Sequence, residues 1–286
     1  MNPFEDRIVP IGHCRDIATC GQLEETSFFS FANTPAIPPA ETARGSVLLV
    51  AGRRGNGKTV YGHRLLHEYH ARNLRPVDLL RIGHVVKGSP ARRHQVLIDL
   101  RKAVDPLDST DLQVDDDIWG DRLCDILNRA GGGLAVRLPG VQQNGATHTD
   151  IAWEICQYAM AAQLNDSVLI YEYLTDTWPD DWHKLFAHVE QNHDVTVRDR
   201  VLDNLSADDL WTYVEGVMER SPNRRIALAP GVPEELRQTF SRRSLSLSGM
   251  HGFMRAAFAA AIAENSPEVS HRHLLTAALD GQGVAA

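Results

Sequence analysis

The chain of 286 residues has a formal net charge of −8 at pH 7, with 43% hydrophobic and 23% charged residues, which is ordinary for a protein with a folded core. The acidic balance argues against a protein that binds polyanions over its whole surface, and no apolar run approaches the length of a membrane span. The four cysteines, Cys14, Cys20, Cys124 and Cys156, show no C-x-x-C spacing, so we expect a reduced, cytoplasmic protein of one large domain or two smaller ones.

Residues 1–44 are expected to form an arm and linker rather than a domain. Short apolar anchors occur at residues 2–4 and 8–10, and Phe28, Phe29 and Phe31 form an aromatic cluster. The Pro-Ala-Ile-Pro-Pro run at residues 35–39 predicts a stiff, extended connector. Because three phenylalanines close together rarely stay in water, we expect the arm to pack on the core or on a neighbouring subunit.

The next stretch carries the strongest functional pattern in the chain. Residues 46–51 are an apolar run typical of a buried parallel strand, and residues 52–59 then read Gly-Arg-Arg-Gly-Asn-Gly-Lys-Thr. This is the G-x-x-x-x-G-K-T pattern of a P-loop, or Walker A motif. The sequence therefore predicts a nucleotide-binding site.

Each residue type in the loop has a physical role. The glycines allow successive N–H groups to turn inward around a phosphate, and the helix expected at residues 58–73 directs its positive end at the same anion. Lys58 is expected to reach the β- and γ-phosphates as a catalytic residue, and the Thr59 hydroxyl to ligate Mg²⁺. The expected nucleotide-binding residues of the loop are Gly52, Gly55, Asn56, Gly57, Lys58, Thr59 and Val60.

The rest of the chain up to residue 204 alternates between strand and helix patterns. Strands are predicted at residues 76–82, 134–138, 168–173 and 195–198, and helices at 91–104, 116–130, 149–163 and 180–191. This alternation predicts an α/β domain over residues 45–204, with a parallel sheet covered by helices on both faces and the phosphate site at the carboxyl edge of the strands. From residue 206 onward we expect helices only, at 206–220, 233–242, 248–264 and 269–279, forming a small helical lid domain over residues 205–286.

A P-loop α/β region followed by a small helical bundle resembles the AAA+ ATPases, with a lid like that of initiator, clamp-loader or STAND-type members. The segment Gly252-Phe253-Met254-Arg255-Ala256-Ala257 is similar to the start of the third lid helix of that family. The resemblance implies that Arg255 is sensor 2, which contacts the nucleotide phosphates from the lid. It also implies ATP with Mg²⁺ as cofactors, and assembly into an oligomer with nucleotide between subunits.

The sequence departs from the family pattern at the Walker B strand. The resemblance places Walker B on the third strand, but residues 134–140 contain no acid, whereas Glu172 ends an apolar run one strand later. Two interpretations are open. Either residues 134–138 are an insertion and Glu172 is the Walker B acid or the adjacent glutamate, or the five strands map in order, Walker B has lost its acids and Glu172 lies near sensor 1.

Basic residues elsewhere have two readings each. Arg198 and Arg200, near the end of the expected fifth strand, are candidates for an arginine finger that reaches a neighbouring subunit, or form surface ion pairs with Asp199 or Asp203. Pairs such as Arg92-Arg93 and Arg224-Arg225 are typical of solvated helix faces. A nucleic-acid partner would require such residues to gather on one surface, so it has only weak support in the sequence.

The functional hypothesis is an AAA+-like ATP-binding protein, acting as an ATPase or an ATP-dependent conformational switch. It would form a homo-oligomer and act on a protein or nucleic-acid partner, and no membrane role is expected. Any hydrolysis, weak or efficient, would depend on Lys58 and Glu172. The alternative is a nucleotide-loaded regulator or scaffold without hydrolysis, akin to STAND-type signalling or defence proteins, and a P-loop kinase ranks last.

Overall fold

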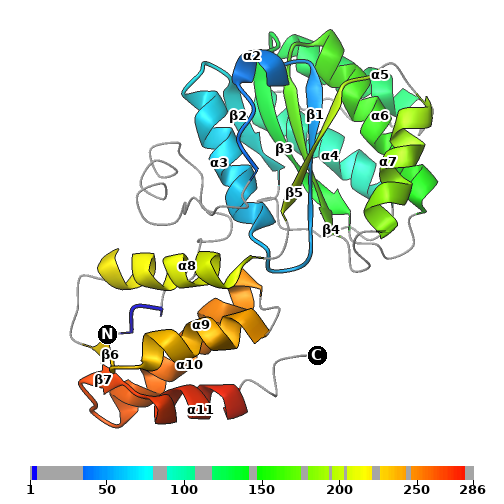
Figure 1. Cartoon of the computed structure of the whole chain (residues 1–286). Coiled ribbons are helices and arrows are strands. Elements are labelled where there is room, and N and C mark those ends of the chain that lie inside the picture. The colour runs from blue at the N-terminus through cyan, green and yellow to red at the C-terminus, as the bar shows by residue number, and fades with distance from the viewer. Residues whose placement is uncertain are drawn as a thin grey trace.

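The structure is a computed structural model that describes residues 2–4, 35–79, 89–106, 118–141, 147–174, 180–192, 195–202, 205–220, 226–242 and 246–280. An α/β part contains the large sheet, and a separate cluster of helices follows it in the chain (Figure 1). Phe28, Phe29 and Phe31 lie outside the described residues. None of the described helices is long and apolar enough to cross a membrane.

The sheet is parallel throughout, as the alternation of strands and helices predicts. Its strands lie in the order β2-β3-β4-β1-β5. Their bounds are β1 Ser46–Gly52, β2 Arg75–Asp78, β3 Leu134–Val141, β4 Val168–Leu174 and β5 Val197–Leu202. Gly52 pairs with both Leu174 and Leu202, so three neighbouring strands end at the same level of the carboxyl edge.

Helices cover both faces of the sheet, and β1 is buried along its whole length. Leu48 and Val50 of β1 face the short helix α2 Ala40–Ala43 and the helix α3 Lys58–His70. Val47 and Leu49 face the opposite layer, which consists of α4 Ser89–Val104, α5 Trp119–Arg129, α6 His148–Leu164 and α7 Asp180–Asn192. A strand buried on both faces has no polar side, which explains the uninterrupted apolar run.

Four helices with their own core form the helical part. They are α8 Ala207–Arg220, α9 Val232–Arg242, α10 Leu247–Ala263 and α11 His271–Asp280. The entry into α8 is fixed by a capping box, in which the Ser206 hydroxyl accepts from the Asp209 amide at 3.1 Å and the Asp209 carboxylate accepts from the Ser206 amide at 3.0 Å. A serine also caps α10, since the Ser246 hydroxyl accepts from the Gly249 amide.

The expectation of helices only beyond residue 206 is wrong. Two short strands, β6 Ala227–Leu228 and β7 Glu268–Val269, pair in parallel within the helical part. Strands of two residues are too short to show an alternating pattern, so the sequence carries no signal for them. The fifth strand also lies later than predicted, because β5 runs from Val197 to Leu202.

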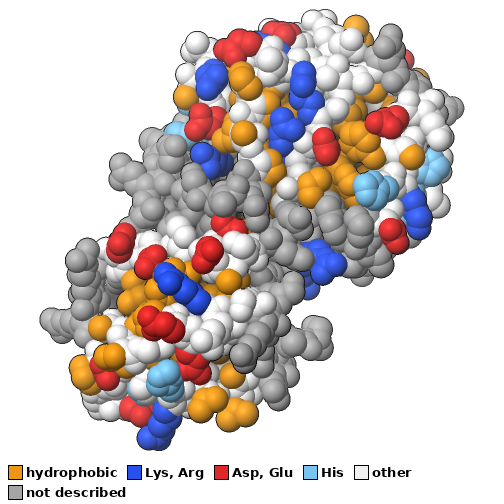
Figure 2. Space-filling view, viewed as in Figure 1, with side chains coloured by type: hydrophobic (Ala, Val, Ile, Leu, Met, Phe, Trp, Pro, Cys, Tyr) orange, Lys and Arg blue, Asp and Glu red, His pale blue; other side chains and the backbone are white. Residues whose placement is uncertain are grey.

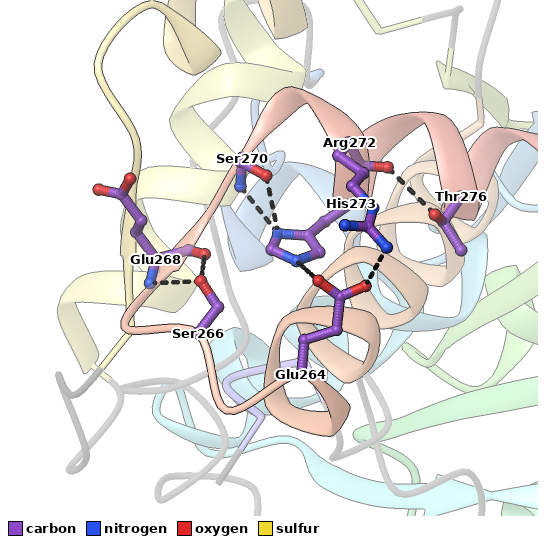
Figure 3. Close-up of polar contacts among 7 residues, drawn as sticks. All are labelled: Glu264, Ser266, Glu268, Ser270, Arg272, His273 and Thr276. Carbon is purple, nitrogen blue, oxygen red and sulfur yellow. Dashed lines mark hydrogen bonds and ion pairs between the residues drawn. The ribbon is translucent and has the colours of Figure 1, made fainter.

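The corner between α10 and α11 is held by polar contacts around Glu264 and His273, drawn in Figure 3. The Ser270 amide donates to His273 Nδ1 at 2.9 Å, so the ring hydrogen lies on Nε2, which faces Glu264 Oε2 at 3.2 Å. Arg272 reaches the other oxygen of Glu264 at 3.2 Å. His273 thus takes the place that glutamate has in an ordinary capping box and ties the start of α11 to the end of α10.

Two pieces of the amino-terminal region contact different parts of the molecule. Phe4 is fully buried in the core of the helical part. Residues 35–43 lie instead on the α3 face of the sheet, where the Tyr69 hydroxyl donates to the Pro38 carbonyl at 3.3 Å. The amino-terminal region therefore attaches to both parts.

Candidate functional site

The loop from Gly52 to Gly57 joins β1 directly to α3 at the carboxyl edge of the sheet, on the side that faces the helical part (Figure 1). Gly55 and Gly57 both have φ of +86°, a backbone conformation that residues with a Cβ rarely adopt. Gly57 is the N-cap residue of α3, which begins at Lys58. The positive, N-terminal end of α3 therefore borders the loop, as in an anion-binding P-loop.

Lys58 and Thr59, the side chains predicted to contact phosphate and Mg²⁺, lie at the loop and the start of α3. Lys58 Nζ lies over the loop, where it donates to the carbonyls of Gly52 at 2.7 Å and Arg53 at 2.8 Å. Thr59 lies in the first turn of α3 and is half-buried. Within the part of the chain that the structure describes, no cluster of His, Cys, Asp or Glu could hold a metal ion by itself. The role of Thr59 as a ligand of Mg²⁺ stays a prediction.

The loop is bonded to the end of β5, immediately before the connection to the helical part. Asn56 is buried, and its Nδ2 donates to the Leu202 carbonyl at 3.2 Å. A Cβ placed on Gly52 would lie 2.9 Å from the same carbonyl oxygen, so this position requires glycine for close approach. The loop is thus in direct contact with the strand that leads to α8.

The loop also touches the start of α10. The Ser248 amide donates to the Gly55 carbonyl at 3.4 Å, and Leu247 lies near Gly57. A Cβ on Gly55 would lie 2.6 Å from the Ser246 hydroxyl oxygen. The positive end of α10 therefore borders the phosphate site, at a Leu-Ser-Gly run whose role the sequence did not reveal.

Arg255, the expected sensor 2 residue, lies further along the same helix. It is nine positions after Ser246, which corresponds to about 13 Å along the helix axis. Its side chain is exposed, and its backbone carbonyl accepts from Asn2 Nδ2 at 2.8 Å. The structure thus brings residues 246–248 to the loop, and the phosphate contact of Arg255 stays a prediction.

Glu172, the expected catalytic acid, belongs to a buried ionic network under α3. Arg137 Nη2 and Nε lie 2.6 and 2.7 Å from Glu172 Oε1, and Arg137 Nη1 lies 3.3 Å from Asp78 Oδ2. His63 Nε2 of α3 lies 3.2 Å from the same Asp78 oxygen. The side chains of these four residues are at most 10% exposed. Glu172 is therefore engaged by a fixed guanidinium rather than by solvent.

The third strand of the chain, β3, lies inside the sheet between β2 and β4. This place fits the interpretation in which the strands map in order, but both interpretations of residues 134–138 stay predictions. The middle of β3 carries Arg137 and no acid. Asp78 and Arg137 were missed, although a charged residue within an otherwise apolar strand is itself a signal of a buried ion pair.

The arginines of β5 lie against α3. Burial raises the pKa of the Tyr61 phenol to about 12, and the nearby cations Arg200 and Arg64 oppose that rise. Over the face shown in Figure 2, basic and acidic side chains are interspersed rather than gathered by sign. Asp203 lies outside the described residues, and the arginine-finger role of Arg198 and Arg200 stays a prediction.

Comparison with known proteins adds to this geometry through structure, because no family model and no curated protein matches the sequence. The ORC2 protein of Aeropyrum pernix, solved in ADPNP-ADP complexes, has a TM-score of 0.58 at 13% identity, with 99% of this chain and 72% of that chain covered. Cdc6p of Pyrobaculum aerophilum has a TM-score of 0.55 at 12% identity, with 93% and 67% covered. Drosophila ORC bound to DNA has a TM-score of 0.51 at 12% identity, with 98% and 63% covered.

This chain has the AAA+ P-loop NTPase fold. The five-stranded parallel sheet and the helical part that follows it match over nearly the whole chain. Identities this low compare folds rather than activities. What the AAA+-like site does is therefore argued from its own residues.

Proposed function

We propose that this protein binds ATP with Mg²⁺ at the loop from Gly52 to Thr59 and acts as an ATP-dependent conformational switch. The observation that carries the proposal is the contact between the Gly55 carbonyl and the Ser248 amide, which places the start of α10 directly against the phosphate loop. The bond from Asn56 to Leu202 supports it from the other side, at the entry into α8. A change in the loop on nucleotide binding is thereby felt at two points of the helical part.

In this proposal each residue of the loop has one task. The amides after Gly55 and the first turn of α3 surround the phosphates, Lys58 neutralises the β- and γ-phosphates, and Thr59 ligates the ion. The γ-phosphate is present in the ATP-bound state and absent from the ADP-bound state. Only that group distinguishes the two states of the switch, so it must act on the elements that border the loop.

The test is a titration with a fluorescent ATP analogue, followed by hydrogen exchange of residues 246–250. We expect Lys58→Ala to abolish binding and Thr59→Ala to remove the effect of Mg²⁺, while Lys184→Ala on the exposed face of α7 serves as a matched control. ATP should change the exchange of residues 246–250 in the wild type and not in Lys58→Ala. Tight binding with unchanged exchange would leave a nucleotide-binding protein but refute the switch.

A second candidate function, a nucleotide-loaded regulator without hydrolysis, is favoured by the pair of Arg137 and Glu172. A carboxylate held in a buried ion pair is a poor acceptor for the proton of an attacking water. We expect turnover well below about 1 s⁻¹, the low end of ordinary enzymes. Glu172→Gln should then change turnover by less than about 3-fold, whereas loss of a working general base would lower it about 100-fold or more.

Assembly and a macromolecular partner complete the proposal. The similar structure of Drosophila ORC is bound to DNA, which supports testing a nucleic acid beside a protein partner. We expect ATP to increase the mass of the particle through formation of a homo-oligomer, measured by light scattering with the Lys58→Ala chain as control. A particle of the same mass in both states would refute assembly driven by nucleotide.

A further inference from the structure

Residues 2–4, with the sequence Asn-Pro-Phe, form a small turn on the surface of α10. Asn2 Oδ1 accepts from the Phe4 amide at 2.9 Å, and Asn2 Nδ2 donates to the Arg255 carbonyl at 2.8 Å. The same side-chain amide thus closes the turn and fixes it to the helix. Pro3 restricts the backbone between the two, which lowers the entropy lost when such a turn forms.

Phe4 enters the core of the helical part. Its side chain is 0% exposed, and its ring centroid lies 5.3 Å from that of Phe258 and 5.6 Å from that of His251. His251 is held in turn by the Tyr213 hydroxyl at 2.6 Å. A buried phenylalanine in contact with two rings is the kind of anchor that dominates the binding energy of a peptide.

The receiving residues come from α8 and α10, far from the turn in sequence. Asn2 and Arg255 are 253 positions apart, whereas Tyr213, His251, Arg255 and Phe258 all lie in the helical part. The contacts select two residues of the tripeptide, a side-chain amide with both a donor and an acceptor and an aromatic ring, while the proline restricts the turn between them. This division between a short segment and a preformed set of helices is that of a peptide and its receptor.

We propose that the helical part contains a recognition site for a turn of the type Asn-Pro-Phe, and that the protein's own residues 2–4 occupy it. A peptide or a partner protein that presents the same tripeptide competes for this site. Because the occupant binds the carbonyl of Arg255, on the helix whose first turn contacts Gly55, its release loosens the helix that borders the phosphate loop. The recognition site itself requires no nucleotide, so it is independent of the proposed function.

The test uses the full-length chain with Phe4→Ala, whose own segment binds weakly, and an acetylated, fluorescent peptide of residues 1–8. We expect saturable binding by anisotropy, with affinity lowered roughly 30-fold or more when the peptide carries Phe4→Ala. A peptide in which Asn2 and Pro3 are exchanged has the same composition and should bind as poorly. The wild-type chain should bind the peptide about 10-fold more weakly than the variant, because its own segment competes.

The titration is run without nucleotide and with ATP, so that a failure of ATP binding does not affect its outcome. A folded Phe4→Ala chain that leaves the peptide unbound, or that binds the exchanged peptide equally well, overturns the proposal. If Phe4→Ala prevents folding, the same titration with the Asn2→Ala chain decides, because that variant keeps the ring and loses the two hydrogen bonds. Equal affinity of the wild-type and Asn2→Ala chains for the peptide then counts against competition by the protein's own segment.

Discussion

Arg137 of β3 and Glu172 of β4 form an ion pair of 2.6 Å inside the sheet, beneath the helix that begins with the phosphate loop. The Arg137 side chain is 1% exposed and also contacts Asp78. A buried ion pair contributes little net stability, but removal of one partner leaves a buried charge without compensation. The pair is therefore more important for the position of Glu172 than for the stability of the fold.

The first prediction concerns this pair. Arg137→Leu should lower the free energy of unfolding by about 3–5 kcal/mol, because Glu172 and Asp78 stay buried without their cation. Arg137→Leu combined with Glu172→Leu should recover part of that loss, since the double variant removes one of the uncompensated charges. Urea unfolding of the four chains of this cycle measures both effects. A double variant less stable than either single variant would contradict the arrangement.

A second prediction concerns Gly62, which lies on α3 over the same network. A Cβ at Gly62 would lie 2.8 Å from Arg137 Nε and 3.0 Å from Glu172 Oε1, and both side chains are buried in an ion pair. We expect Gly62→Ala to cost about 1–3 kcal/mol through overpacking, despite the helix propensity of alanine. Gly252→Ala in α10 is the matched control, because no atom lies within 4 Å of its added Cβ. That variant should gain about 0.5–1 kcal/mol, and thermal melts compare the two.

A third prediction concerns Gly55, which lies in the phosphate loop against Ser246 at the start of α10. Gly55→Ala forces a residue with a Cβ into φ of +86° and pushes that Cβ against Ser246. Gly131→Ala likewise places a Cβ at a positive φ, of +80°, but no neighbouring atom lies within 4 Å of it. Gly131→Ala should therefore cost about 1–2 kcal/mol of stability and leave nucleotide affinity unchanged. Gly55→Ala should cost more and also weaken nucleotide binding. Gly131 lies outside the phosphate loop, so its variant measures the cost of a Cβ at positive φ alone. Equal nucleotide affinity of the two variants would contradict a role of Gly55 in nucleotide binding.

A fourth prediction concerns the thiol of Cys156 in α6. Burial raises its pKa to about 11, so at pH 8.5 the folded chain keeps Cys156 as a neutral, inaccessible thiol. Alkylation at this pH should proceed only through unfolding and accelerate in denaturant. The unfolded chain ionises this group near pH 8.5, and the folded chain does so near pH 11. The contribution of Cys156 to stability is therefore complete below pH 8.5 and is lost as the pH rises through that window. Rapid labelling of the native chain, detected on the Cys156 peptide by mass spectrometry, would contradict the burial.

Patterns that depend on neighbouring residues could be predicted from the sequence. The apolar run of β1 and the strand–loop–helix arrangement around residues 52–59 each follow from local chemistry, and both appear where expected. The order of the strands could not be predicted, because it depends on pairings between distant segments. The ion pair of Glu172 could not be predicted for the same reason, since its partner Arg137 lies 35 residues earlier in the chain.

The contact between α10 and the loop is a further feature that the sequence did not predict. The Leu-Ser-Gly run at residues 247–249 is visible in the sequence, but only the packing of two separate cores brings it to Gly55. The resemblance predicts sensor 2 at Arg255, further along the same helix, and that role stays a prediction. Which residues of α10 lie against the loop depends on where the helix begins, and here it begins at Leu247.

The burial of Phe4 has a mechanical consequence for the chain. The backbone between β5 and α8 is one attachment of the helical part, and the phenylalanine, more than two hundred residues away, is another. A protease that cut once between β5 and α8 would produce two fragments that still elute together from a size-exclusion column. The larger fragment keeps the Phe4 ring buried in the core of the smaller one. Separation of those fragments would then require denaturant, or a second chain whose aromatic residue takes the same place.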